Sequence, residues 1–154
     1  MQNLSFTTHG IQVLLERLEP AKAPGPDQIP TKIIKLCANS IAPVLQIIFT
    51  QSLQHATLPQ DWLSANIIPV FKKGNRSTPA NYRPISLTSV TCKVMEHIIF
   101  HHIMSHFTSQ NLLIPLQHGF RPNHSCQTQL IDFIDEIQRS MNARQQTDLV
   151  LRLH

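Results

Sequence analysis

Apolar residues recur at helical spacing near the start of the chain. From Ile11 to Leu18 they fall three or four positions apart, which predicts a short amphipathic helix that ends before Pro20. The next segment, Ala21 to Pro30, contains three prolines and a glycine, and neither a helix nor a central strand accommodates that composition. The pattern therefore predicts a loop of restricted flexibility at residues 20–30.

Two further helices are predicted between Pro30 and Pro59. Pro30 suits a first helical turn, because its missing N–H would have no partner there. Ser40 is the predicted N-cap of the following helix, which the Leu58-Pro59 pair closes. The expected buried faces are Ile33, Ile34 and Cys37 in the first of these helices and Leu45, Ile48, Phe49 and Ser52 in the second.

The middle of the chain has the pattern of a β-hairpin. Two short apolar runs, Ile67–Phe71 and Tyr82–Leu87, flank a polar turn segment. The turn segment contains Gly74, Asn75, Ser77 and Pro79. Trp62, just before the first strand, is expected to anchor the strand entry in the core rather than to stack on a nucleic-acid base.

Two more helices are predicted after the hairpin. Ser89 is the predicted N-cap of a long helix, and Ser125 that of the last one, whose exposed face carries an Asp135–Arg139 pair. The expected apolar faces are Val90, Val94, Met95, Ile98, Ile103 and Phe107 in the long helix and Leu130, Ile134 and Ile137 in the last. The fold class predicted from the whole pattern is α+β, mainly helical with one antiparallel hairpin.

The composition is that of an ordinary globular chain. Its 154 residues are 42% hydrophobic and 14% charged, which suits one domain with a sizeable core. Three widely spaced cysteines indicate neither a disulfide framework nor a Cys-x-x-Cys metal site, and they favour a reducing compartment. No apolar run reaches the roughly 20 residues that span a bilayer, and the N-terminus lacks a signal-peptide pattern. We therefore expect an intracellular protein, in cytoplasm or nucleus, that is not secreted and has no membrane partner.

Positive charge is concentrated around the predicted hairpin. No acidic residue occurs between Asp61 and Glu96, so the five cations in this window give a local charge of about +5, against +4 for the whole chain. They are Lys72, Lys73, Arg76, Arg83 and Lys93. Such a ribbon suits polyanions, because each cation that displaces a counterion from a phosphate adds to affinity. Charge alone also fits a solvated loop whose lysines only maintain solubility.

Several stretches resemble reverse transcriptases encoded by non-LTR (LINE-like, jockey-like) retrotransposons. Asn66-Ile-Ile-Pro-Val-Phe-Lys-Lys-Gly74 and Asn81-Tyr-Arg-Pro-Ile-Ser-Leu-Thr88 resemble the fingers segment of that family. Lys22-Ala-Pro-Gly-Pro-Asp27 resembles its opening block, and Gln117-His-Gly-Phe-Arg-Pro122 its next block. The resemblance implies a partial reverse transcriptase domain over residues 1–154, the fingers and the start of the palm of a right-hand polymerase. It would comprise a helical part at 10–60, a basic fingers hairpin at 61–88, and helices with a template-facing block at 89–147.

The resemblance also implies which residues contact phosphates. In the family the fingers supply cations to the triphosphate of the incoming nucleotide, and Lys72 or Lys73 together with Arg83 match those positions. Lys22 matches a loop near the template strand, and Arg76 adds a cation for nucleic acid at the hairpin. The implied partners are an RNA template, a DNA primer and deoxynucleoside triphosphates.

A second group of implied template contacts lies outside the hairpin. Asp27 shares its loop with Lys22, while Phe120 and Arg121 belong to the block that faces the template and the nucleotide site in the family. Gly119 is expected to permit a positive φ or a close backbone approach beside them.

The catalytic carboxylates of the family have no counterpart in this sequence. Reverse transcriptases hold two Mg²⁺ ions with aspartates, and the first of these would fall at about Leu153. There is no Tyr-x-Asp-Asp motif, since Tyr82 is the only tyrosine. We therefore expect a chain truncated before the catalytic strand, with no catalytic residues and no metal site of its own, inactive by itself. Mg²⁺ is expected only for the full-length family enzyme. A basic RNA-binding module and a non-functional relic of the element remain open as alternatives.

Two histidine pairs raise the question of a metal. His97 with His101 and His102 with His106 have the i, i+4 spacing at which two imidazoles can share one zinc ion. No cysteine or carboxylate is suitably placed in the sequence to complete a shell, so the prediction is that these pairs bind no metal.

Overall fold

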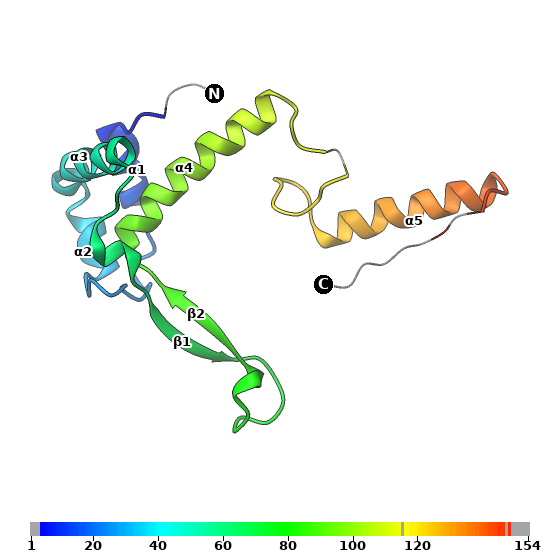
Figure 1. The fold of residues 1–154 in the computed structure, drawn as a ribbon, viewed down its shortest axis with the longest axis horizontal. Helices are drawn as coiled ribbons and strands as arrows, with labels where there is room; N and C mark the ends of the chain where they lie inside the picture. The colour runs from blue at the N-terminus through cyan, green and yellow to red at the C-terminus, as the bar shows by residue number, and fades with distance from the viewer. Residues whose placement is uncertain (1–3, 115, 147, 149–154) are drawn as a thin grey trace. The chain divides into compact units, whose positions relative to one another are not determined.

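The computed structural model describes residues 4–114, 116–146 and 148 of the chain. These belong to two units, Met1–His106 and Phe107–His154. In the described part of the chain the elements are helices and one two-stranded antiparallel sheet (Figure 1), which confirms the α+β class.

Helix α1 (Thr8–Glu16) and helix α3 (Ala38–His55) pack against each other in the first unit. The side chain of Thr7 caps α1, because its oxygen accepts the N–H of the third helical residue at 3.2 Å. Ile11 and Leu15 are fully buried in this helix. The first predicted helix is therefore confirmed, displaced by two or three residues toward the N-terminus.

Helix α2 (Thr31–Leu36) corrects one predicted face. It buries Thr31 and Ile34, whereas Ile33 is 48% exposed and Cys37 is also exposed. The prediction that Ile33 and Cys37 are buried is therefore wrong. A helix of under two turns has room for one row of inward residues three positions apart, and Thr31 and Ile34 occupy it.

The start of α3 is a second correction. The helix begins at Ala38, so Ser40 lies inside its first turn and is not the N-cap. Burial explains the earlier start, because Ala38 and Ala42 both pack in the core while Ser40 is exposed. The predicted buried side of Leu45, Ile48, Phe49 and Ser52 is confirmed, with Ile48 partly buried.

Phe49 lies at the centre of the core. The rings of Phe6 and Trp62 meet it edge-on, at centroid distances of 5.3 and 5.7 Å. Trp62 belongs to the short 3₁₀ helix η1 (Gln60–Leu63) that leads into the hairpin. Its expected role as a core anchor at the strand entry is confirmed.

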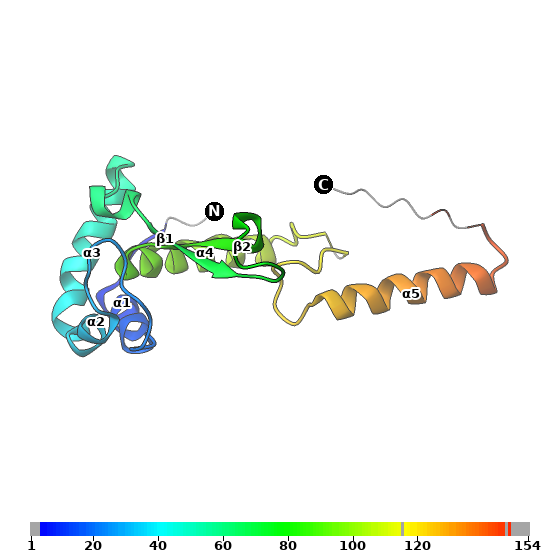
Figure 2. The same ribbon diagram turned by 90° about the horizontal axis from the view of Figure 1, so that it is seen from below.

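The predicted hairpin is present, with its first strand one residue longer. Strand β1 (Asn66–Phe71) pairs antiparallel with β2 (Tyr82–Leu87), and the 3₁₀ helix η2 (Pro79–Asn81) lies in the connecting loop. Every residue of β1 is exposed, including Ile67 and Val70. Figure 1 shows the two strands as a ribbon that extends away from α1, α2 and α3, and Figure 2 shows the same ribbon from below.

Helix α4 (Val90–Ser109) completes the core with its first two turns. Val90, Val94 and Met95 are buried, as predicted, whereas Ile103 and Phe107 are each 37% exposed. The broad apolar face is therefore confirmed only for the N-terminal part of this helix.

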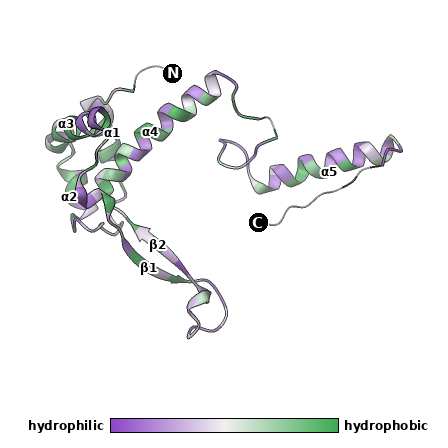
Figure 3. Ribbon diagram, viewed as in Figure 1, coloured by the Kyte–Doolittle hydropathy of each residue, from purple (hydrophilic) through white to green (hydrophobic). Residues whose placement is uncertain are grey.

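Helix α5 (Cys126–Asn142) is the regular element of the second unit. The predicted cap is confirmed, because Ser125 and Thr128 form a reciprocal capping box. The predicted Asp135–Arg139 ion pair is also present. Apolar and polar residues alternate around this helix (Figure 3), yet none of its described residues is buried.

The three cysteines are all free. Cys37 and Cys126 are exposed, whereas Cys92 is buried in α4. Burial first, and then the neighbouring Glu96 carboxylate, raise the pKa of the Cys92 thiol to about 11. Cys92 is therefore protonated at neutral pH and a poor nucleophile.

None of the helices in the described part of the chain combines the length and apolarity that a membrane span requires.

Candidate nucleic-acid interface

The loop at the tip of the hairpin is ordered by its own hydrogen bonds. The N–H of Lys72 donates to the carbonyl of Asn81 at 2.8 Å. The side chain of Asn75 accepts both the N–H and the hydroxyl of Ser77, at 3.0 and 2.8 Å, and its carbonyl accepts from the Asn81 amide at 2.8 Å. Gly74 has φ +90°, and a side chain there would meet the Asn81 amide at 2.8 Å. The basic tip is thus a preformed loop.

Aromatic contacts hold Arg76 against the ribbon. The rings of Phe71 and Tyr82 pair edge-on at 5.5 Å, and the Arg76 guanidinium lies over the Phe71 ring at 5.3 Å. The Tyr82 hydroxyl donates to the carbonyl of Arg76 at 2.8 Å. Arg76 remains exposed, so a fixed, planar set of donors is presented at the tip.

The strand register decides which side chains share a face. Arg83 stands opposite Val70, and Ile68 stands opposite Ile85. Opposed residues of an antiparallel pair point to the same side, so Arg83 lies on this exposed, mainly aliphatic face. Lys72 extends β1 by one hydrogen-bonded residue, and alternation along the strand places it on the same face.

The proline-rich loop is fixed to the base of the hairpin. The carboxylate of Asp27 accepts the Ser89 hydroxyl at 2.6 Å and the N–H of Ile29 at 3.4 Å. Both of its oxygens are therefore used inside the protein, a structural role that the sequence pattern did not indicate. Lys22 lies in the same loop with an exposed side chain, and its carbonyl accepts the Thr31 hydroxyl at 3.1 Å.

The block around Phe120 corrects the role expected of Gly119. A Cβ added to Gly119 would meet nothing within 4 Å, and the positive φ falls instead on Phe120, at +60°. Phe120 is 96% exposed, although a left-handed backbone is unusual for a bulky residue. Arg121 donates from Nη1 to the carbonyls of Ile114 and Gln117, at 3.1 and 3.4 Å. The block thus carries an exposed aromatic ring at Phe120 and, at the next residue, an anchored guanidinium.

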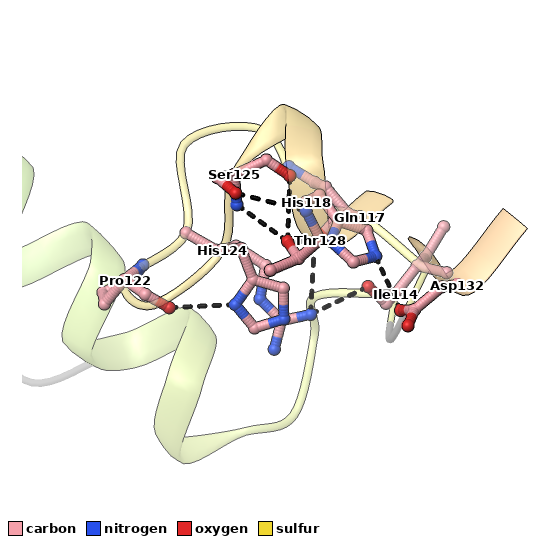
Figure 4. A network of polar contacts seen from close by, with 9 residues as sticks. Ile114, Gln117, His118, Pro122, His124, Ser125, Thr128 and Asp132 are labelled. Atoms are coloured by element: carbon pink, nitrogen blue, oxygen red, sulfur yellow. Dashed lines mark hydrogen bonds and ion pairs between the residues drawn. The ribbon is translucent and has the colours of Figure 1, made fainter. Parts of the chain in front are cut away.

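A histidine network in this block was not foreseen from the sequence. His118 is only 7% exposed, with Nε2 3.2 Å from the Asp132 carboxylate and Nδ1 2.9 Å from the Thr128 hydroxyl (Figure 4). The ring of His124 meets it edge-on at a centroid distance of 5.0 Å, and His124 donates from Nδ1 to the carbonyl of Pro122. These contacts fasten the loop to the first turns of α5. The spacing of His118, His124 and Asp132 in the sequence gave no indication that these side chains would interact.

The described residues offer no evident metal site. No group of three or more histidine, cysteine, aspartate or glutamate residues in this part of the chain is arranged to hold an ion. The rings of His97 and His101 meet edge-on at 4.4 Å. Leu153, where the resemblance expects a catalytic aspartate, lies outside the described residues.

The predicted site residues thus fall into separate groups. Lys72, Lys73, Arg76 and Arg83 all lie on the hairpin, with exposed side chains. Lys22 lies on the helical part of the same unit, while Phe120 and Arg121 belong to the second unit.

Comparison with known proteins shows relatives of one kind. No protein-family model matches the chain. The chain is 31% identical over 127 residues to the RNA-directed DNA polymerase from mobile element jockey of Drosophila melanogaster, a match covering 82% of the chain and 14% of that protein. It is 30% identical over 112 residues to the probable RNA-directed DNA polymerase from transposon BS of the same species, covering 72% of the chain and 12% of that protein. The corresponding protein from transposon X-element is 29% identical over 125 residues, covering 80% of the chain and 14% of that protein.

The chain therefore spans about one seventh of the length of the first of these relatives. These matches cover between 72% and 82% of the chain. The chain belongs to the RNA-directed DNA polymerases encoded by non-LTR retrotransposons.

Proposed function

We propose that the hairpin is the phosphate-binding part of the fingers of a retrotransposon reverse transcriptase. In this proposal residues 1–154 are the fingers and the start of the palm of a right-hand polymerase. The main support for this proposal is the pairing register of β1 and β2. Arg83 lies opposite Val70 on an exposed face of the hairpin, and Lys72 extends that face. The surrounding window has five cations and no acid to neutralise them.

Lys72 and Arg83 are the proposed pair for the β and γ phosphates of a deoxynucleoside triphosphate. Arg supplies a planar fork that bonds phosphate oxygens in pairs, and Lys a compact charge beside it. Lys73 follows in the bend after β1, so it assists from the tip. Strand alternation favours Lys72 over Lys73 as the direct partner of Arg83.

The proposed template contacts are Arg76, Lys22, Phe120 and Arg121. Arg76 is held in place by Phe71, and the exposed ring of Phe120, a residue with a left-handed backbone, suits stacking on an unpaired base. The proposed partners are an RNA template and a DNA primer.

Mg²⁺ does not fit the described residues. Two-metal phosphoryl transfer needs clustered carboxylates, and the described residues contain no such cluster. We therefore assign these residues binding and positioning only. In the proposed function the 154 residues alone do not extend a primer on an RNA template, and extension above background with Mg²⁺ and deoxynucleotides would contradict this.

The nucleotide site is tested by titrating the 17.5 kDa protein with dGTP and following the NMR signals of the Arg83 guanidinium. These signals are expected to shift saturably with dGTP and not with deoxyguanosine, which has the same base and sugar but no phosphates. Equal shifts with both ligands, or none with either, would refute the phosphate role.

A basic module that binds nucleic acid without catalysis is the second candidate. It is favoured by the tip loop, which is ordered by its own side chains rather than by packing on another element. Both candidates predict strand binding, whereas only the polymerase proposal predicts the dGTP response. A relic would show neither response, and its exposed apolar surface would cause aggregation.

Strand binding is tested by the salt dependence of affinity for a primed RNA template. If the hairpin binds the strand as a basic module, the variant Lys72→Ala/Arg83→Ala is expected to flatten the slope of log K against log salt by about 1.4 to 1.8, because each lost phosphate contact accounts for roughly 0.7 to 0.9. In the polymerase proposal this pair binds the nucleotide triphosphate, so the slope measured for the strand is expected to stay unchanged. The matched control Lys32→Ala/Arg144→Ala removes the same charge outside the hairpin. An equal change of slope in the control would show that the effect comes from net charge alone and not from the hairpin.

A further inference from the structure

A cavity of about 370 Å³ lies in the first unit, away from the hairpin tip. Its walls come from the C-terminal end of α1, the segment that follows it, and the first two turns of α4. Cavities of this size accept small ligands or one unit of a polymer.

The floor of the cavity is apolar. Leu14, Leu18 and Val94 form it, and Val94 is buried in the main core. Leu14 and Leu18 pack against the same core and are partly buried. The floor is therefore held by the main core of the unit.

The rim of the cavity is cationic. Arg17, Lys22 and Lys93 approach it from three different segments, and Glu19 is the one acidic residue of the lining, which leaves a formal charge of +2. His97 adds a side chain that carries a further charge when protonated. An anion at this rim would meet converging cations rather than a single lysine.

These cations are available to a ligand. Within the described part of the chain, no ion pair involves Arg17, Lys22 or Lys93, and the side chains of all three are exposed. Three cations near a single carboxylate, that of Glu19, keep a net positive charge, and an anion bound between them lowers their mutual repulsion.

We propose that this cavity binds one nucleotide unit of a single nucleic-acid strand, with the phosphodiester at the Arg17, Lys22 and Lys93 rim. The sugar and base would rest on the Leu14, Leu18 and Val94 floor. A cationic rim over an apolar floor fits an amphipathic nucleotide unit better than a bare anion, which would gain nothing from the floor. The choice of ligand rests on the proposed function, but the residues are separate from the hairpin pair Lys72 and Arg83.

The test is an NMR titration of the whole chain with three probes: the single-stranded oligonucleotide rU4, uridine 5′-monophosphate and inorganic phosphate. The methyl signals of Val94 and the ring signals of His97 report the cavity, and Arg83 reports the hairpin. We expect rU4 to shift the cavity signals saturably, at lower concentrations than the monophosphate, while inorganic phosphate has little effect. Equal response to rU4 and inorganic phosphate would reduce the cavity to a simple anion site and overturn the proposal, as would no response to rU4.

The variant Arg17→Gln/Lys93→Gln is expected to weaken the rU4 response of the cavity at least about tenfold. The matched control Lys32→Gln/Arg144→Gln should leave it unchanged, and an equal loss in the control would overturn the proposal. Fluorescence of Trp62, which lies against the core, verifies that each variant is folded. If the Val94 and His97 signals do not change with rU4 while the Arg83 signals shift with dGTP, only the inference about the cavity is refuted. If the cavity signals shift with rU4 while the Arg83 signals do not change with dGTP, only the proposed role of the hairpin is refuted.

Discussion

Single residues fix the base of the hairpin. Gly25 is buried, and a Cβ at this position would lie 2.6 Å from the backbone nitrogen of Ser89 and the carbonyl carbon of Thr88. The proline-rich loop can therefore approach the end of β2 only because residue 25 has no side chain. The Asp27–Ser89 hydrogen bond closes the same contact.

Gly25→Ala is expected to lower the free energy of unfolding by about 1–3 kcal/mol, because backbone atoms on both sides must move to admit the methyl group. Urea unfolding followed by Trp62 fluorescence measures this effect. Ala23→Ser changes an exposed residue of the same loop and should stay within about 0.5 kcal/mol of the parent chain. A Gly25→Ala protein as stable as this control would show that the loop moves freely.

Prediction from the sequence succeeded at this scale where a side chain acts locally. The cap at Ser125 and the Asp135–Arg139 pair were foreseen, because each depends on residues three or four positions apart. The His118–Asp132 pair and the engagement of Asp27 were not foreseen, because their partners are brought together only by the fold.

The hairpin is the most weakly supported element of the first unit. Both of its strands consist of exposed or partly exposed residues, whereas α3 has a fully buried residue at Phe49. A two-stranded ribbon without a covering layer is only marginally stable. Its order comes from the cross-strand pairs and from its two ends, the tip loop and the base beside Gly25.

Amide hydrogens of β1 and β2 are therefore expected to exchange with solvent at least about tenfold faster than those in the middle of α3, because local opening of the ribbon exposes little apolar surface. Hydrogen exchange measured by NMR or mass spectrometry tests this expectation. Amides of α1 provide the internal reference, since Ile11 and Leu15 are fully buried. Equal protection in the hairpin and in α3 would mean that another layer covers the ribbon in solution.

At this scale the sequence predicted elements better than their boundaries. The hairpin was predicted to within one residue, because strand runs and turn residues are contiguous in the sequence. The start of α3 was wrong, since Ser40 has the chemistry of a cap but burial of Ala38 extends the helix past it. The exposed second half of α4 could not be read from its apolar spacing, because spacing does not reveal whether a partner is present.

The main core belongs entirely to the first unit. Its buried cluster runs in sequence from Phe6 to Met95 and includes residues of α1, α2, α3 and α4. No residue of the unit Phe107–His154 contributes to this cluster in the described part of the chain.

Residues 1–106 produced alone are therefore expected to unfold with the same free energy as the full chain, to within about 0.5 kcal/mol, when Trp62 fluorescence is followed in urea. Circular dichroism of the shortened chain would confirm that its helices persist. A loss of more than about 1 kcal/mol would show that the second unit supports the core in solution.

The hydrogen bond between Ser89 and Asp27 joins positions 62 residues apart. Helix α4 begins directly after Ser89, and its residues Val94 and Met95 close the core. During translation at roughly 5–20 residues per second, about 3–12 seconds separate the synthesis of these two partners. Until α4 has been made, the apolar faces of α1, α2 and α3 are not covered by it, and the hairpin is made before its base can be attached. The nascent chain is therefore most in need of a chaperone before α4 has been synthesised, and a translational pause shortly before codon 95 would harm folding more than one after it.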